Sequence, residues 1–178
     1  NSRIMYAGSA GGGVWKSNDG GATFAPIFDD HVQSIGVVTL DPKDPDNIIW
    51  VGTGETWTRN SVSVGNGLFR STDGGGNWKE IEGFENSERI ASIVINPNNT
   101  NEIYVGVLGA LWSDSEDRGG CRSSDGGKTW NGTKGLKGFY RNKNNKVIYE
   151  GKGTKNRPET ENYSYWQGDV ALERVDAT

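Results

Sequence analysis

One eight-residue phrase occurs three times in this chain, and this repetition constrains the fold more than any other feature. The pattern Ser-x-Asp-Gly-Gly-x-(Thr/Asn)-(Trp/Phe) begins at residues 17, 71 and 123. A phrase that recurs at a near-constant period of about 50 residues is typical of folds built from repeated supersecondary units. The sequence therefore predicts three copies of one structural unit, each with the same turn at the same place.

Each position of the repeated phrase has a role in a tight turn. The Asp side chain can accept hydrogen bonds from the backbone N–H groups that follow it, and the two glycines can adopt positive φ. The aromatic residue starts the next strand and offers an apolar face to a neighbouring sheet. We therefore interpret the phrase as structural and not catalytic. Its key residues are Ser17, Asp19, Gly21, Phe24, Ser71, Asp73, Gly75, Trp78, Ser123, Asp125, Gly127 and Trp130.

The repeated phrase resembles the Asp-box, or bacterial neuraminidase repeat, of sialidases, sortilin-type receptors and xyloglucanase-type glycosidases. The phrases at 50–55 and 59–71 most resemble bacterial secreted propellers of the sortilin-like kind. This resemblance implies an all-β fold: β-propeller blades, each a four-stranded antiparallel sheet, with the Asp-box on the turn between the third and fourth strands. It also implies an extracytoplasmic protein. It leaves the function open, because the Asp-box occurs in enzymes and binding proteins alike.

The apolar pattern divides residues 1–133 into blades. We expect a partial blade at 1–30, which lacks its first strand, and complete blades at 31–83 and 84–133. In the second of these three units, strands are expected at 34–40, 47–52, 68–70 and 77–81.

Residues 134–178 contain no further Asp-box, so this segment is either a degenerate fourth blade or another β segment. Within it, strands are expected at 146–151, 163–168 and 171–175. Closed propellers typically have four to eight blades, so we expect the chain to be part of a larger propeller. The remaining blades, or another chain, would then complete the ring.

Composition excludes several classes of function. The net charge of −4 argues against a general nucleic-acid or anionic-membrane binder, and no apolar run approaches the ~18 residues of a membrane helix. Cys121 is the only cysteine and His31 the only histidine, so no disulfide framework or cysteine metal site is expected. We expect no metal and no cofactor.

Two insertions are the candidate site. The chain between the second strand and the Asp-box is about ten residues longer in the second unit, and about eight longer in the third, than in the first. Exposed tryptophans beside charged groups suit a glycan or a protein partner on this loop face. In the alternative interpretation, both tryptophans pack against neighbouring loops, and the charged side chains of the insertions only contact solvent. The candidate ligand-binding residues are Trp57, Arg59, Asn60, Trp112 and Arg118.

Two functions remain open from the sequence. The first hypothesis is a non-catalytic propeller that binds or scaffolds an extracytoplasmic protein or glycan. The alternative is part of a polysaccharide-active glycoside hydrolase, which needs two carboxylates about 5–9.5 Å apart. Glu55 with Asp114 or Glu116 could supply that pair. Sialidase activity is not expected, because the arginine that sialidases carry before their first box has no counterpart here.

Overall fold

The computed structural model describes residues 3–57, 60–112, 115–134, 138–141 and 147–151. These residues form antiparallel sheets in which strands that follow one another along the chain pair with each other. The first sheet, here called the first blade, has the order β1-β2-β3. Its strands are β1 (Met5–Ser9), β2 (Gly13–Ser17) and β3 (Ala25–Pro26).

The second and third blades each have four strands. The second is β4 (Ile35–Leu40), β5 (Ile49–Thr53), β6 (Leu68–Ser71) and β7 (Lys79–Glu80). The third is β8 (Ile90–Ile95), β9 (Ile103–Val107), β10 (Gly119–Ser123) and β11 (Asn131–Lys134). Each sheet keeps sequence order from one edge to the other, which confirms the predicted all-β class with four-stranded antiparallel sheets.

Beyond the third blade, β12 (Gly138–Arg141) pairs antiparallel with β13 (Val147–Gly151). The strand expected at 146–151 is therefore β13. The strands expected at 163–168 and 171–175 lie outside the described residues.

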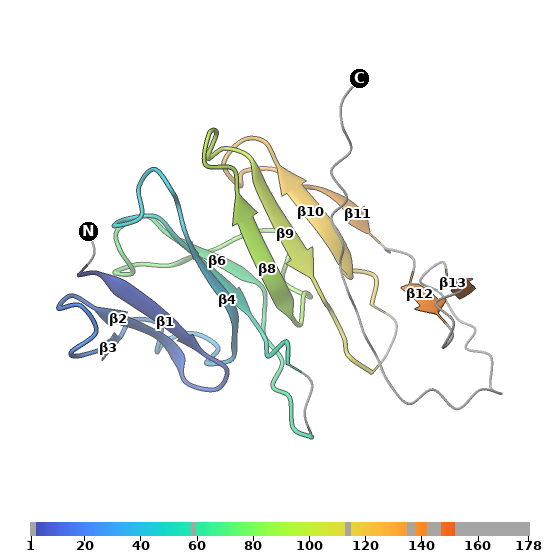
Figure 1. The fold of residues 1–178 in the computed structure, drawn as a ribbon, viewed down its shortest axis with the longest axis horizontal. Coiled ribbons are helices and arrows are strands. Elements are labelled where there is room, and N and C mark those ends of the chain that lie inside the picture. The colour runs from blue at the N-terminus through green and yellow to red at the C-terminus, as the bar shows by residue number, and fades with distance from the viewer. Residues whose placement is uncertain (1–2, 58–59, 113–114, 135–137, 142–146, 152–178) are drawn as a thin grey trace.

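The three blades stand side by side along the molecule (Figure 1). β1 packs against β4, and β4 packs against β8. One buried cluster lies between the first and second blades: Val14, Phe28, Ile35, Ile49, Val51 and Phe69. A second lies between the second and third: Trp50, Leu68, Ile81, Phe84, Ile90, Ile93, Ile95, Ile103, Val105 and Val107. The core of this protein is thus the set of contacts between neighbouring sheets.

The inner strands β4 and β8 carry the same irregularity. The register against the second strand shifts between Ile35 and Val37 in one blade, and between Ile90 and Ser92 in the other. The skipped residue in β4 is Gly36. A Cβ there would overlap the Ile90 carbonyl oxygen and lie 2.6 Å from the Gly54 carbonyl oxygen, so close packing of the third blade requires glycine at this position.

The Asp-boxes form the predicted turns. In the second blade, Ser71 Oγ donates to Asp73 Oδ1 over 2.8 Å and accepts from Gly75 N over 2.9 Å. Asp73 accepts from Asn77 N at 2.9 Å and from Asn77 Nδ2 at 2.6 Å. The other two boxes repeat these bonds. All six box glycines have φ between 71° and 93°, which confirms the predicted positive φ.

The box carboxylates are acceptors for their own turns. Hydrogen bonds from the Thr23 side chain and backbone lower the pKa of Asp19 to about 2. Bonds from Asn77 lower the pKa of Asp73 to about 2 in the same way, and bonds from Thr129 lower the pKa of Asp125. These groups stay ionised at neutral pH and hold the turn together.

The box aromatic residues differ from the prediction in one respect. β7 starts at Lys79, so Trp78 precedes the fourth strand and does not open it. Its ring instead reaches the first blade, where Nε1 donates to the Ile27 carbonyl oxygen at 2.7 Å. Packing against the preceding blade therefore decides the position of this residue, and the short fourth strand begins after it.

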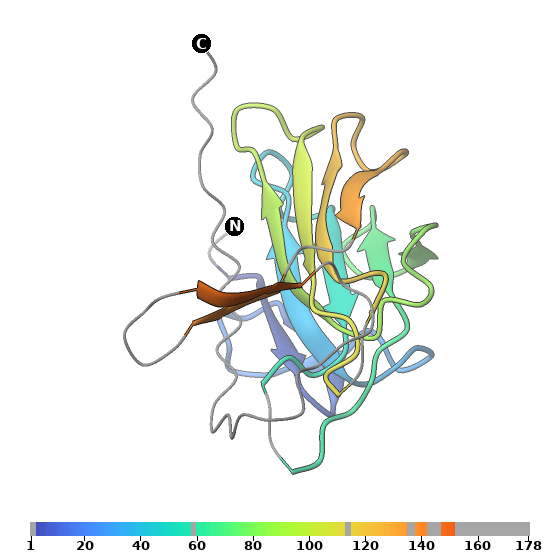
Figure 2. The same ribbon diagram turned by 90° about the vertical axis from the view of Figure 1, so that its right-hand side faces the viewer.

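Asp-boxes and insertion loops lie at opposite ends of the strands, because one follows the third strand and the other precedes it (Figure 2). Within the part of the chain described here, no helix is long and apolar enough to cross a membrane.

Candidate functional site

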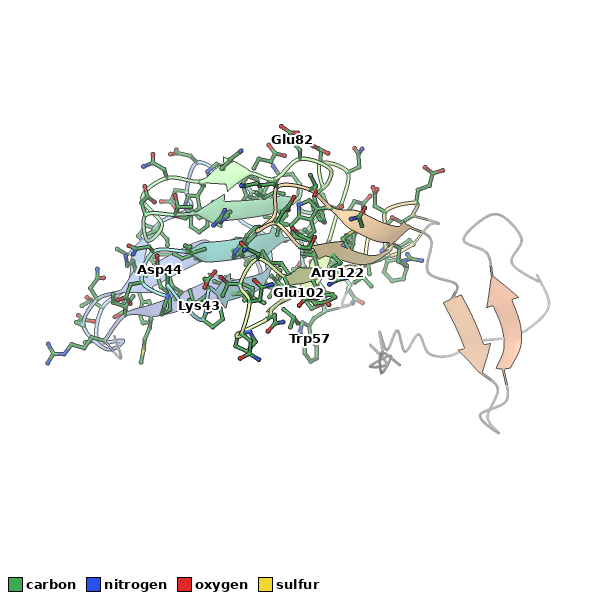
Figure 3. All side chains as sticks on the ribbon, turned by 90° about the horizontal axis from the view of Figure 1, so that it is seen from above. Lys43, Asp44, Trp57, Glu82, Glu102 and Arg122 are labelled. Carbon is green, nitrogen blue, oxygen red and sulfur yellow. The ribbon has the colours of Figure 1, made fainter. Side chains whose placement is uncertain are left out.

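The candidate site consists of the β5–β6 loop and the β9–β10 loop, which leave the same end of adjacent blades. Each loop carries a tryptophan in solvent: Trp57 is 88% exposed and Trp112 is 76% exposed. Figure 3 shows the Trp57 side chain beyond the edge of the ribbon. The alternative that both rings pack against neighbouring loops is therefore wrong, and the two rings are available to a ligand.

The base of the β5–β6 loop is held by buried polar groups. Thr53 Oγ1 accepts from the Asn66 and Gly67 amides, both at 2.9 Å, and donates to the Gly67 carbonyl oxygen at 2.7 Å. Thr53 is completely buried. A buried hydroxyl with three partners fixes the two ends of the loop against each other.

Glu55 belongs to the same fixed base. Only 3% of the residue is exposed. Its Oε2 accepts from the Ser63 amide at 2.7 Å, while its own amide donates to the Ser63 carbonyl oxygen at 3.0 Å. The sequence suggested a carboxylate that faces a substrate. The structure places this carboxylate inside the loop, where it ties the two sides together.

The β9–β10 loop is held by Arg118. Its Nε donates to the Leu108 carbonyl oxygen at 2.9 Å, and its Nη2 donates to the Ala110 carbonyl oxygen. The guanidinium thus binds backbone on the opposite side of its own loop, just before Trp112. The sequence suggested Arg118 as a ligand-binding residue, and in the structure its donors support the loop that presents Trp112.

The residues that link the two loops were not among the candidates from the sequence. The Glu88 carbonyl oxygen accepts from the Gly65 amide of the first loop at 2.7 Å, and the Arg89 carbonyl oxygen accepts from the Leu108 amide at 2.9 Å. Arg89 is buried, and its Nη1 pairs with Glu88 Oε2 at 2.6 Å and contacts the Gly109 carbonyl oxygen at 3.3 Å. Two adjacent charged residues before an apolar inner strand are the sequence signal that could have marked this link.

The remaining candidates fall into two groups. Asn60 and Glu116 are exposed on their loops. Arg59 and Asp114 lie outside the described residues. No group of three or more His, Cys, Asp or Glu side chains that could hold a metal ion occurs among the described residues.

The described residues thus define part of a propeller with Asp-box turns, whose two insertion loops are rigid at the base and carry aromatic tips. The comparisons with known proteins point to one group of such propellers. The sequence is 26% identical over 140 residues to a xyloglucanase of Hypocrea jecorina (strain QM6a), covering 63% of this chain and 16% of that protein. The chain therefore spans about one sixth of the curated relative. No protein-family model matches it.

Among solved structures, the chain resembles an ancestral GH74 enzyme with a TM-score of 0.57 and 23% identity, covering 75% of this chain and 17% of that one. The GH74 enzyme of Niastella koreensis is 20% identical over 75% of this chain and 28% of its own, with a TM-score of 0.41. The xyloglucanase relative and the ancestral GH74 enzyme together show that the chain is similar in sequence and structure to part of a larger GH74 xyloglucanase propeller.

Proposed function

We propose that this chain is part of a polysaccharide-active glycoside hydrolase of the xyloglucanase-like kind. In this proposal the two insertion loops hold a glucan chain across adjacent blades. The observation that carries it is the pair of exposed rings, Trp57 and Trp112, at the same end of two blades. The C–H faces of a sugar ring stack on such aromatic surfaces, while polar loop groups bond to its hydroxyls.

The rigid loop bases support this role. An aromatic platform binds best when it is ordered before the ligand arrives, because less side-chain and loop entropy is then lost on binding. Glu55, Arg118 and the Glu88–Arg89 link each bind loop backbone. In this proposal they are positioning residues, and Asp114 or Glu116 would supply one of the two catalytic carboxylates. A polymer substrate implies that the protein acts outside the cytoplasm.

The binding test uses the 178-residue chain and soluble xyloglucan oligosaccharide, with affinity measured by calorimetry. Trp57→Ala and Trp112→Ala should each weaken binding about tenfold, the loss of one stacking contact. Phe24→Ala is the matched control, because Phe24 is an aromatic residue 43% exposed in the first blade, away from the loops. Oligosaccharide affinity that survives removal of both tryptophans would refute the proposal.

A non-catalytic glycan- or protein-binding propeller of the sortilin-like kind remains the second candidate. The burial of Glu55 favours it, since this carboxylate is already bonded within its loop. Release of reducing sugar from xyloglucan, measured on the whole protein that contains this chain and not on the 178-residue chain alone, separates the two. In the hydrolase, Glu116→Gln or Asp114→Asn abolishes turnover while affinity is kept. In the binding protein no variant, and no wild-type sample, releases sugar.

A further inference from the structure

A groove of about 600 Å³ lies between the first and second blades, beside β7, the outermost strand of the second blade. The β3–β4 connection lines one side of the groove, and the strands β6 and β7 line the other side. The groove thus lies within the row of three blades, between two of its members. It is separate from both exposed tryptophans of the insertion loops.

The floor of the groove is aromatic. Phe69 is 2% exposed, and Trp78 and His31 are half-buried. Phe28 packs beneath them and meets Phe69 and Trp78 edge to face, with ring centroids 5.3 and 5.0 Å apart. The His31 ring lies 4.6 Å from that of Phe28 and 5.0 Å from that of Phe69. Packed rings of this kind form a firm surface whose faces attract positive charge.

The wall from the first blade is fixed before any ligand binds. The His31 amide donates to the Phe28 carbonyl oxygen at 3.1 Å. Gln33 Nε2 donates to the carbonyl oxygens of Phe28 at 3.0 Å and His31 at 2.8 Å, and the Gln33 carbonyl oxygen accepts from the Gly13 amide at 2.8 Å. Because these bonds hold the turn that carries Asp30, little loop entropy is lost when the groove is filled.

One carboxylate stands on each wall of the groove. Glu80 is the cross-strand partner of Phe69, and directly opposed side chains project from the same face of a sheet, so Glu80 lies on the face toward the first blade. Asp30 comes from the facing wall. Both residues are exposed, and within the described part of the chain neither forms an ion pair. The groove thus combines an aromatic floor with two carboxylates.

We propose that this groove binds an arginine side chain of a partner polypeptide. A guanidinium is planar and weakly hydrated, so it stacks on aromatic rings while its edge donates to carboxylates. Asn66, exposed at the rim, adds an amide oxygen as a further acceptor. The chain uses the same pairing internally, where the Arg70 guanidinium lies 5.1 Å from the Trp50 ring centroid. The proposal is independent of the sugar site.

The test titrates the 178-residue chain with the peptide acetyl-Gly-Gly-Arg-Gly-Gly-amide and follows the indole N–H signals by NMR. The Trp78 indole donates to the Ile27 carbonyl oxygen at 2.7 Å, and Trp78→Phe identifies its signal by loss. This signal should shift saturably, with a dissociation constant of about 1 mM, while the signals of Trp57 and Trp112 stay in place. A peptide with Gln in place of Arg should not bind, and one with Lys should bind at least about threefold more weakly.

Three variants locate the binding site. Glu80→Gln and Asp30→Asn should each weaken binding of the arginine peptide about threefold, and together about tenfold, as expected for exposed ion pairs. Both residues are exposed, so both variants should melt like wild type. Glu82→Gln is the matched control, because Glu82 is an exposed carboxylate two residues after Glu80 that does not line this groove (Figure 3).

Three results would overturn the proposal. The first is the absence of a saturable Trp78 shift up to about 10 mM arginine peptide. The second is equal affinity for the Arg, Lys and Gln peptides, which would mean that the groove does not recognise a guanidinium. The third is a loss of affinity in Glu82→Gln as large as that in Glu80→Gln, which would mean that only the overall negative charge attracts the peptide.

Discussion

Gly127→Ala tests whether contacts between blades, and not turn geometry alone, set the Asp-box sequence. Gly126 and Gly127 are adjacent, with φ of 75° and 85°. An alanine at either position adopts a left-handed conformation that costs about 1–2 kcal/mol. Only at Gly127 does the new methyl group overlap a buried ring, that of Trp50, which is 1% exposed. At Gly126 the nearest atom is Asn101 Oδ1, the end of a flexible side chain, at 3.1 Å.

Overpacking of a buried site costs about 1–3 kcal/mol in addition to the backbone cost. Gly127→Ala should therefore destabilise the fold by about 2 kcal/mol more than Gly126→Ala. For a chain of this size, that difference corresponds to a Tm about 6 °C lower. Thermal melting by circular dichroism and urea unfolding by tryptophan fluorescence measure both variants side by side.

A double-mutant cycle with Trp50→Phe completes the test. The smaller ring leaves room for the methyl group, so part of the Gly127→Ala loss should be recovered in the double variant, with a coupling energy of about 1 kcal/mol. Equal destabilisation by Gly126→Ala and Gly127→Ala, together with strict additivity in the cycle, would show that the contact with Trp50 does not constrain this glycine.

Three further predictions concern the same framework. Ser71→Ala should lower the free energy of unfolding by about 1–3 kcal/mol, because the Gly75 amide loses its acceptor in a buried place; a loss below the error of urea titration would contradict this. The pKa values of Asp19 and Asp73 are lowered to about 2 in the fold, so the stability they contribute is complete above their unfolded pKa near 3.8 and falls as pH drops toward 2. Tm measured from pH 6 to about 2 should decline mainly below pH 4, and a constant Tm would be inconsistent with these bonds. Gly36→Ala should destabilise strongly, because its Cβ overlaps the Ile90 carbonyl oxygen, and normal melting of this variant would mean that the second and third blades are not packed as described.

The sequence predicted which loops form the candidate site, but not how the side chains of those loops are arranged. The spacing between the second strand and the Asp-box located both loops, and the exposure of Trp57 and Trp112 agrees with a binding role. The sequence could not distinguish a carboxylate in a cleft from one bonded to its own loop, so it suggested Glu55 as a catalytic group. That distinction depends on the Ser63 amide, whose position follows from how the loop folds back on itself.

The repeated phrase by itself determined the turn, and the family that it resembles implied the four-stranded blade. The hydrogen bonds of the Asp-box Ser and Asp side chains join residues within one octet, such as Ser71, Asp73 and Asn77, so local chemistry is sufficient to specify the turn. Only the tertiary structure decided which residues meet between blades and between loops. Lys16 with Gly74, Trp78 with Ile27, and Glu88 with Gly65 are far apart along the chain, and each pair depends on how one sheet packs on the next. No periodicity in the sequence encodes that packing, because it arises from the shapes of the faces that the sheets bury.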